Sequence, residues 1–233
     1  MPNKKKYRGV LFDLDHTLWD YETNAKETLQ TLFQRHLTNR TAVPFHHFHH
    51  HFVRINTQLW LDFDRGMIPR EVIRDQRFHR IFREVGIDDH PLSLVFSEDY
   101  VRESPQKSNL LPQAREVVDY LCQRYPLVIV TNGFEEIQTV KVDASGLRPF
   151  FRAVITSERA QSKKPEPGIF SLALEHLGAT ADETIMIGDN LLTDIAGARQ
   201  SGIDQVFYNP QGQPHSSACT YEIRELNELR AFL

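Results

Sequence analysis

The sequence contains little cysteine, since Cys122 and Cys219 are the only two among its 233 residues. Two cysteines are too few for a disulfide framework, so a reducing, cytoplasmic compartment is expected. Long hydrophobic runs are also absent, because no stretch approaches the roughly 20 apolar residues that a membrane-spanning helix needs. We therefore expect no membrane partner.

Positive charge is scarce as well: 27 Lys and Arg against 31 Asp and Glu give a net charge of −4. This balance argues against a nucleic-acid polymer as a partner, because such partners bind largely through neutralised phosphates. No G-x-G-x-x-G or G-x-x-x-x-G-K-[ST] pattern follows the first apolar run, which disfavours a nucleotide-binding module. With 40% hydrophobic and 25% charged residues, the chain suits a globular protein of one large or two smaller domains.

Short apolar runs alternate with helical patterns over much of the chain. Uninterrupted apolar strands that alternate with helices predict a parallel sheet covered on both faces. The expected strands are residues 10–12, 127–131, 153–156, 184–187 and 205–208, and the helices between them are residues 114–124, 135–145, 168–177 and 194–201.

The stretch between the first two strands shows helical spacing and no convincing strand. Its apolar residues predict helices over 24–37, 45–63, 72–85 and 92–103, with Asn24 as the N-cap of the first. We therefore predict a doubly wound, Rossmann-like α/β core made of residues 1–17 and 109–233. A helical cap domain, residues 18–108, is inserted after the first strand of this core.

Two carboxylates, Asp13 and Asp15, directly follow the first predicted strand. Side chains alternate along a strand, so both should point the same way where the strand opens into a loop. Two acids that close repel each other unless a cation lies between them or one holds a proton. A purely structural role as loop caps is disfavoured, because carboxylates gathered at several strand ends are costly without a cation.

Other predicted strands also end in polar residues. The strand over 127–131 ends in Thr131 and Asn132, the strand over 184–187 is followed by Asp189 and then Asp194, and Lys164 lies in the loop after residues 153–156. In doubly wound sheets, ligands bind beyond the carboxyl ends of the strands. These side chains should therefore converge with the two early carboxylates on one edge of the sheet.

This combination of side chains suits phosphoryl transfer, which needs a cation, hydrogen-bond donors and an in-line nucleophile. Mg²⁺ prefers the hard oxygen ligands that aspartates supply. We expect Asp13 to be the nucleophile that forms an aspartyl-phosphate. Asp15 should serve as general acid to the leaving alkoxide and then as general base to water. Thr131, Asn132 and Lys164 are expected to hold the phosphoryl oxygens.

The ordered motifs of the chain resemble those of the haloacid dehalogenase-like phosphohydrolases. The resemblance implies that Mg²⁺ is held by Asp13, the backbone carbonyl of Asp15, and Asp189, while Asp194 supports the water shell of the metal or Lys164. His16 stands where glycine is common in this family. The matching residues are Asp13-Leu14-Asp15-His16-Thr17, Thr131-Asn132-Gly133, Lys164-Pro165 and Gly188-Asp189 followed by Asp194.

Asp15 separates branches of that family. Haloacid dehalogenases lack an equivalent acid because a halide leaves without a proton, so Asp15 favours hydrolysis of phosphate esters. Two segments of the predicted cap and one of the core look like the bacterial pyrimidine 5′-nucleotidases, which implies a nucleoside monophosphate, including noncanonical pyrimidine ones, as substrate. Trp60 is then a candidate to stack on the base, although aromatic residues at helical spacing more often pack in a core. The segments are residues 59–63, 66–68 and 131–134.

Several alternatives stay open at this point. The substrate could be phosphoglycolate or a sugar phosphate, and the reaction could be that of a phosphomutase. A receiver-like signalling domain also combines an acidic Mg²⁺ site, an acceptor aspartate, a threonine and a lysine. Asp15 and the large cap argue against this reading, because both suit turnover. We expect a monomer or a weak homodimer, and the preferred base and sugar are left open.

A histidine-rich stretch, residues 46–51, resembles a metal site. His47 and His51 have the i, i+4 spacing that places two ligands on one face of a helix. Phe45, Phe48 and Phe52 account for the buried face of the same helix, which leaves most of the histidines exposed. We therefore interpret this stretch as a surface feature.

Overall fold

The computed structural model describes residues 7–233, which divide into two compact units. One unit comprises the described residues up to Tyr21 together with Ser108–Leu233, and the other comprises Glu22–Lys107. The first junction falls after Tyr21, four residues later than the boundary after residue 17 expected from the sequence. The second falls before Ser108, one residue earlier than the expected boundary before residue 109.

A six-stranded parallel sheet forms the centre of the first unit, in the order β3-β2-β1-β4-β5-β6. The predicted doubly wound α/β class is thereby confirmed. The sixth strand was not predicted, because three residues with a polar centre carry little strand pattern. The strands are β1 Gly9–Phe12, β2 Leu127–Thr131, β3 Ala153–Thr156, β4 Thr184–Gly188, β5 Asp204–Tyr208 and β6 Tyr221–Ile223.

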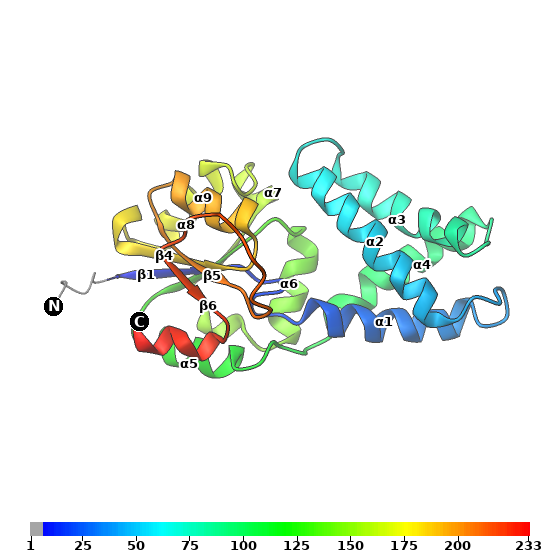
Figure 1. The fold of residues 1–233 in the computed structure, drawn as a ribbon, viewed down its shortest axis with the longest axis horizontal. Helices are drawn as coiled ribbons and strands as arrows, with labels where there is room; N and C mark the ends of the chain where they lie inside the picture. The colour runs from blue at the N-terminus through cyan, green and yellow to red at the C-terminus, as the bar shows by residue number, and fades with distance from the viewer. Residues whose placement is uncertain (1–6) are drawn as a thin grey trace. The chain divides into compact units, whose positions relative to one another are not determined.

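Helices cover both faces of this sheet (Figure 1). The α-helices of the unit are α5 Ala114–Cys122, α6 Glu135–Ala144, α7 Ser157–Ala160, α8 Pro167–Leu177 and α9 Ala196–Gln200. Short 3₁₀ turns are η2 Arg148–Phe150, η3 Ala181–Glu183 and η5 Leu226–Ala231, and η4 Leu191–Ile195 is a π-helical turn. Both cysteines are free, as expected for a chain without a disulfide framework.

Side chains of successive strand residues enter two separate cores. On β1, Val10 and Phe12 pack with α5 and α6, whereas Leu11 packs with α8. This alternation follows from the pleat, which turns neighbouring side chains to opposite faces. Because both faces are buried, the strands are continuously apolar, and that is why they could be located from the sequence.

The strand order reverses at β1, which lies between β2 and β4. Phe12 is in register with Ile129 on one side and with Ile187 on the other. The backbone N–H of Asp13 then donates to the carbonyl of Ile187 over 2.9 Å, which carries the pairing one residue beyond the strand. The carboxyl ends of β1, β2 and β4 therefore meet at the switch point, where ligands bind in sheets of this kind.

The second unit is helical, with a core rich in aromatic side chains. Phe48, Phe78 and Phe96 are fully buried there, and the Phe78 and Phe96 ring centroids are 4.7 Å apart. No helix among residues 7–233 is long and apolar enough to cross a membrane. The helices are α1 Tyr21–His36, α2 Phe45–Asp64, α3 Arg70–Glu84, α4 His90–Glu103 and the 3₁₀ turn η1 Ser104–Gln106.

Asn24 was predicted as the N-cap of the first helix, and this prediction was wrong. Helix α1 begins at Tyr21, and Asn24 is completely buried one turn inside it. The start is fixed by the segment before it, where Trp19 forms an antiparallel bridge with Leu110 and the N–H of Asp20 donates to Asn109. A local capping pattern contains no information about such a long-range pairing.

Candidate active site

Asp13 lies at the end of β1 and is buried, with 7% of its surface exposed. Its Oδ1 accepts a hydrogen bond of 2.5 Å from Nζ of Lys164. Burial, joined by the nearby Asp194 and Asp15, raises the pKa of Asp13 to about 7, although Lys164 acts in the opposite direction. The charged form of Asp13 is therefore disfavoured, because the positive charge of Lys164 does not fully offset burial and the neighbouring acids.

Lys164 is held by three acceptors and is almost fully buried. Its Nζ donates to Asp13 Oδ1 over 2.5 Å, to Asp194 Oδ1 over 2.6 Å and to the carbonyl of Val130 over 2.9 Å. Burial alone would lower the pKa of Lys164, but the two carboxylates hold it above its usual value. An ammonium group has three donors, so contact with a phosphoryl oxygen requires one of these hydrogen bonds to open or to be shared.

Asp189 completes a cluster of acids with Asp13 and Asp194. One carboxylate oxygen from each residue lies within 4.8 Å of the others. Burial, followed by repulsion from Asp13, raises the pKa of Asp189 to about 6, and burial also raises the pKa of Asp194. Thr17 donates to Asp189 Oδ1 over 3.1 Å and helps to orient it. Such a set of hard oxygen donors, two of them buried and one partly buried, fits a divalent cation such as Mg²⁺.

Asp194 is the least available of the three acids. Its Oδ1 accepts from Lys164, and its Oδ2 accepts from the backbone N–H of Asn190 over 3.0 Å. Because both oxygens are engaged, Asp194 suits an indirect role in which it supports Lys164 or the metal's water shell. The same choice of roles was implied by the family resemblance.

Thr131 and Asn132 lie where β2 ends, and their side chains have different partners. The Thr131 hydroxyl oxygen accepts from the Gly133 N–H over 3.1 Å and from Nε2 of Gln138 over 2.7 Å. With both lone pairs filled, the hydroxyl can act toward a further group as a donor. The Asn132 amide instead pairs with the backbone of Lys164, accepting over 2.8 Å and donating over 3.0 Å. Asn132 thus fixes the lysine loop, and its predicted contact with phosphoryl oxygens stays a prediction.

Asp15 does not join the acidic cluster with its side chain. Its Oδ1 accepts from Nζ of Lys141 over 2.6 Å, and its Oδ2 accepts from Nε2 of Gln138 over 2.8 Å. Burial would raise the pKa of Asp15, but Lys141 and Gln138 outweigh it and hold the pKa below its ordinary value. Asp13 and Asp15 therefore lie two residues apart in opposite electrostatic environments.

Comparison with known proteins identifies the family. A family model for haloacid dehalogenase-like hydrolases matches residues 7–202. The chain belongs to this family. The predicted resemblance is thereby confirmed, and the chain is a hydrolase of the haloacid dehalogenase-like type.

Relatives within the family align over nearly the whole chain. The HAD-hydrolase YfnB of Bacillus subtilis is 32% identical in sequence, and the alignment covers 97% of this chain and 94% of YfnB. The magnesium-bound crystal structure of YfnB superposes with a TM-score of 0.87 and 31% identity, and covers 97% of this chain and 98% of the YfnB chain. The pyrimidine 5′-nucleotidase PynA of Streptococcus pneumoniae is 32% identical over 96% of this chain and 93% of its own. The pyrimidine 5′-nucleotidase YjjG of Escherichia coli is 27% identical over 98% of both chains.

His16 stands where the family resemblance implies glycine, and its backbone conformation suits glycine. The residue has a φ of 63°, in the left-handed region that glycine adopts without strain. Histidine is one of the few other residues enriched there. The His16 N–H donates to the Trp19 carbonyl over 3.1 Å, and its ring centroid lies 4.8 Å from that of Tyr21. The loop after β1 therefore keeps its tight turn without glycine.

Gln138 and Lys141 were missed by sequence reasoning. Both lie on α6 and are buried, with 0% and 6% of their surfaces exposed. The sequence predicted this helix over residues 135–145 but assigned no role to its polar side chains. A signal was nevertheless present, because Gln138 lies one turn before the buried Val142 on the same helical face, and Lys141 lies one turn after Gln138. Polar side chains on the buried face of a helix next to a site are candidates for function.

Trp60 lies on α2 in the helical unit. The residue is partly exposed, and its ring is perpendicular to that of Phe63, with centroids 5.6 Å apart. This contact agrees with a packing role. The contribution of Trp60 to substrate binding stays a prediction.

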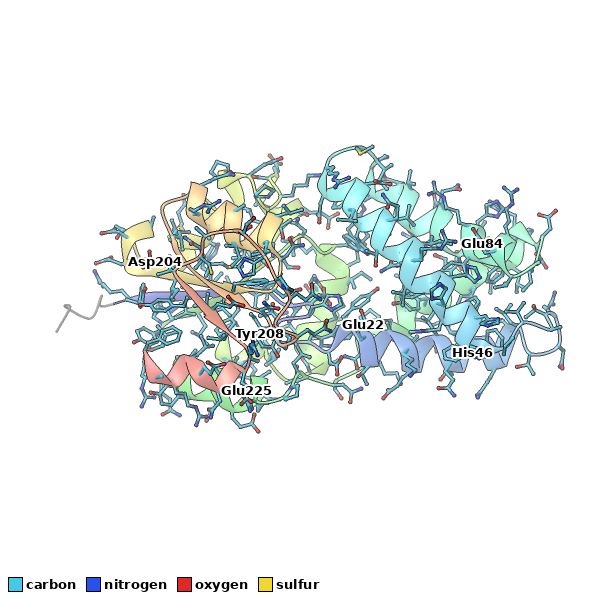
Figure 2. The ribbon with its side chains drawn as sticks, in the orientation of Figure 1. Glu22, His46, Glu84, Asp204, Tyr208 and Glu225 are labelled. Atoms are coloured by element: carbon cyan, nitrogen blue, oxygen red, sulfur yellow. The ribbon has the colours of Figure 1, made fainter. Side chains whose placement is uncertain are left out.

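The histidine-rich stretch contributes no three-ligand cluster. Of the residues that the structure describes, only Asp13, Asp189 and Asp194 form a group of three or more possible metal ligands. His46 is exposed at the start of α2, and Glu84 ends α3 (Figure 2). His51 faces this glutamate, with Nδ1 3.7 Å from its Oε2, and Arg54 pairs with the same carboxylate over 2.9 Å. The surface interpretation accounts for these contacts.

Proposed function

We propose that the chain is a Mg²⁺-dependent phosphomonoester hydrolase that acts on nucleoside 5′-monophosphates, most of all pyrimidine ones. The observation that carries this proposal is the arrangement at the switch point, where Lys164 lies between Asp13 and Asp194 while Asp189 closes the acidic cluster. Asp13 and Asp189 would hold the metal with the backbone carbonyl of Asp15. When bound, Mg²⁺ would neutralise charge on the phosphoryl oxygens.

The first step in this proposal transfers the phosphoryl group to the protein. A carboxylate oxygen of Asp13 attacks phosphorus, and the bond between phosphorus and the ester oxygen breaks. Asp15 gives its proton to the leaving alkoxide, which departs as an alcohol. Asp15 must be protonated for this step, and the negative charge of an entering phosphoryl group raises its pKa in the required direction. Thr131 donates its hydroxyl hydrogen to a phosphoryl oxygen.

The second step releases inorganic phosphate. Asp15 is now a carboxylate and takes a proton from water as the water oxygen attacks phosphorus. The bond from phosphorus to the Asp13 oxygen breaks, which restores the Asp13 carboxylate, and the proton taken from water leaves Asp15 protonated for the next cycle. Lys164 stabilises the negative charge of Asp13 when it leaves, because its Nζ contacts the Oδ1 atom of that residue.

The experiment that tests this proposal is a substrate panel with the purified protein. Phosphate release is measured with Mg²⁺ for pyrimidine and purine nucleoside monophosphates, sugar phosphates, phosphoglycolate and p-nitrophenyl phosphate. We expect the highest kcat/KM for a pyrimidine nucleoside monophosphate and complete loss of activity in excess chelator. A preference for a sugar phosphate or phosphoglycolate would support the alternative metabolite phosphatase. Stable phosphorylation without turnover would support a receiver-like domain, and isomerised sugar phosphate a phosphomutase.

Trp60→Ala tests the nucleoside part of the proposal. If the indole stacks on the base, kcat/KM for the nucleotide should fall by about tenfold or more, because stacking on an aromatic side chain is worth roughly 1 to 3 kcal/mol per base. The kcat/KM for p-nitrophenyl phosphate should stay unchanged. Equal losses for both substrates would make Trp60 a packing residue. The cytoplasmic location and the monomeric or weakly dimeric state stay predictions.

A further inference from the structure

We infer that Gln138 and Lys141 are positioning residues that hold the Asp15 carboxylate in the orientation its acid and base roles require. The inference rests on the proposed hydrolase function, because it assigns these residues an effect on one step of that chemistry.

Each oxygen of Asp15 receives one donor from α6. Lys141 donates to Oδ1 over 2.6 Å and Gln138 donates to Oδ2 over 2.8 Å. The two donors are three residues apart, so they lie on the same face of the helix, one turn from each other. Two donors on the two oxygens of a planar carboxylate fix its plane as well as its position. A single ion pair would leave the carboxylate free to rotate.

Lys141 is itself held from a second side by the loop that carries Asp15. The Trp19 ring is completely buried, and its centroid lies 4.4 Å from the Lys141 ammonium. The Tyr21 ring centroid lies 5.7 Å from the same nitrogen. Trp19 is brought back beside Asp15 by a backbone bridge between the two residues. The ammonium group is therefore enclosed by the carboxylate and by aromatic faces that attract a cation.

Gln138 connects Asp15 to the phosphate-binding side of the site. Its amide nitrogen has two hydrogens, of which one is donated to Asp15 Oδ2 and the other to Thr131 Oγ1 over 2.7 Å. The Gln138 amide thus fixes the position of the Asp15 carboxylate relative to the Thr131 hydroxyl, which is proposed to bind the phosphoryl group. A Cβ atom at Gly133 would lie 2.1 Å from the Gln138 nitrogen, so glycine at this position leaves the room that the amide needs.

Positioning of this kind affects catalysis because proton transfer requires the acid to lie within hydrogen-bond reach of the leaving oxygen. A displacement of about 1 Å can cost on the order of a hundredfold in rate. An ion pair that only stabilised the fold would have no such consequence for chemistry. A positioning role and a purely structural role therefore predict different results. Only with a positioning role does the loss of activity caused by replacing Lys141 depend on the leaving group of the substrate.

The test compares Lys141→Met with Lys141→Arg on two substrates, uridine monophosphate and p-nitrophenyl phosphate. The ratio kcat/KM reports the step in which the leaving group departs. The nucleoside alkoxide needs a proton from Asp15, whereas p-nitrophenolate leaves without one. Asp143→Asn is the matched control on α6, because it removes an exposed ion pair with Arg148 and touches nothing in the site. Melting temperatures show that each variant is folded.

We expect Lys141→Met to lower kcat/KM for uridine monophosphate by about tenfold and to change that for p-nitrophenyl phosphate by less than about twofold. Lys141→Arg should recover most of the loss, because it restores a donor and a positive charge. Gln138→Met should show the same dependence on leaving group without any change of charge. Asp143→Asn should behave as the wild-type protein.

Combining each variant with Asp15→Asn completes the test, because residues that act through one carboxylate are not additive. In that background, Lys141→Met should cause no further loss of kcat/KM for uridine monophosphate. Equal losses on both substrates, or additive losses in the double variant, would overturn the inference and leave Lys141 a structural residue. A wild-type protein that hydrolyses no phosphate ester with Mg²⁺ would instead contradict the proposed function.

Discussion

The loop after β1 carries two aspartates, Asp13 and Asp15, whose surroundings shift their pKa values in opposite directions. Asp13 faces Asp189 and Asp194, and burial among these acids raises its pKa to about 7. Asp15 faces Lys141 and Gln138, which hold its pKa below the ordinary value against the effect of burial. The two carboxylates therefore suit different roles. Asp13, which lies among other acids, suits a metal ion and attack on phosphorus, whereas Asp15, which is paired with Lys141, suits proton transfer.

Asp13→Asn should break this comparison most severely. An amide cannot attack phosphorus and is a poorer metal ligand, so turnover of every substrate should fall below detection. The fold should persist, because asparagine has nearly the same shape and its oxygen can still accept from Lys164. Phosphate release and circular dichroism measure the two outcomes. Ordinary turnover in this variant would remove Asp13 as the nucleophile.

Lys164→Ala should have the next largest effect. We expect about a hundredfold loss in kcat, which corresponds to roughly 3 kcal/mol of transition-state stabilisation. The buried carboxylates of Asp13 and Asp194 would then face each other without their shared cation, so the melting temperature in chelator should also fall. Lys163→Ala is the neighbouring control and should change neither quantity much. A change confined to KM would indicate uniform binding of the phosphoryl group instead.

The affinity for Mg²⁺ should depend on pH, because two of the proposed ligands have raised pKa values. Asp13 and Asp189 have pKa values raised to about 7 and about 6, so both must lose protons before they can hold a metal. Affinity should therefore rise with pH between about 5 and 7, by up to about tenfold per unit for each proton displaced, and level off above that range. Calorimetric titration in buffers of different ionisation enthalpy measures affinity and proton release together. A constant affinity across this range would contradict the assignment.

The smallest expected effect is the change in thermal stability that Asp189→Asn produces. A carboxylate whose pKa is raised by folding destabilises the native state above that pKa and has no such effect below the unfolded value near 4. In chelator at pH 8 the variant should therefore melt a few degrees higher than the wild-type protein, and near pH 4 the two should agree. With Mg²⁺ the order should reverse, because only the wild-type protein gains the full binding energy. Differential scanning calorimetry distinguishes these cases.

The sequence was informative where a buried strand ends abruptly in polar residues. Asp13, Thr131 and Asp189 follow continuous apolar runs, and the topology of parallel sheets then brings them to one edge. Lys164 was located by its motif in a loop. These residues were predictable because their positions depend on order along the chain, which the sequence contains directly.

Features that depend on distant partners were not predictable in the same way. The role of Lys141 is set by Asp15, which lies 126 positions away in the sequence. Strand β6 was missed because Tyr221–Ile223 is short and takes its conformation from pairing with β5. The function of Trp60 depends on what approaches the helical unit, and neither periodicity nor composition describes that.

The paired segments at the base of the inserted unit have a consequence for the history of such proteins. Leu18 accepts from the Leu111 N–H over 2.9 Å, and Trp19 bridges to Leu110, so the chain leaves the sheet and returns to it through adjacent backbones. The two ends of the segment between Trp19 and Leu110 are therefore held side by side by backbone hydrogen bonds. A change of length within such an insertion leaves these backbone pairs in place. If Trp60 contacts the substrate as proposed, replacements within the helical unit can alter substrate preference while the residues at the carboxyl ends of the strands stay the same.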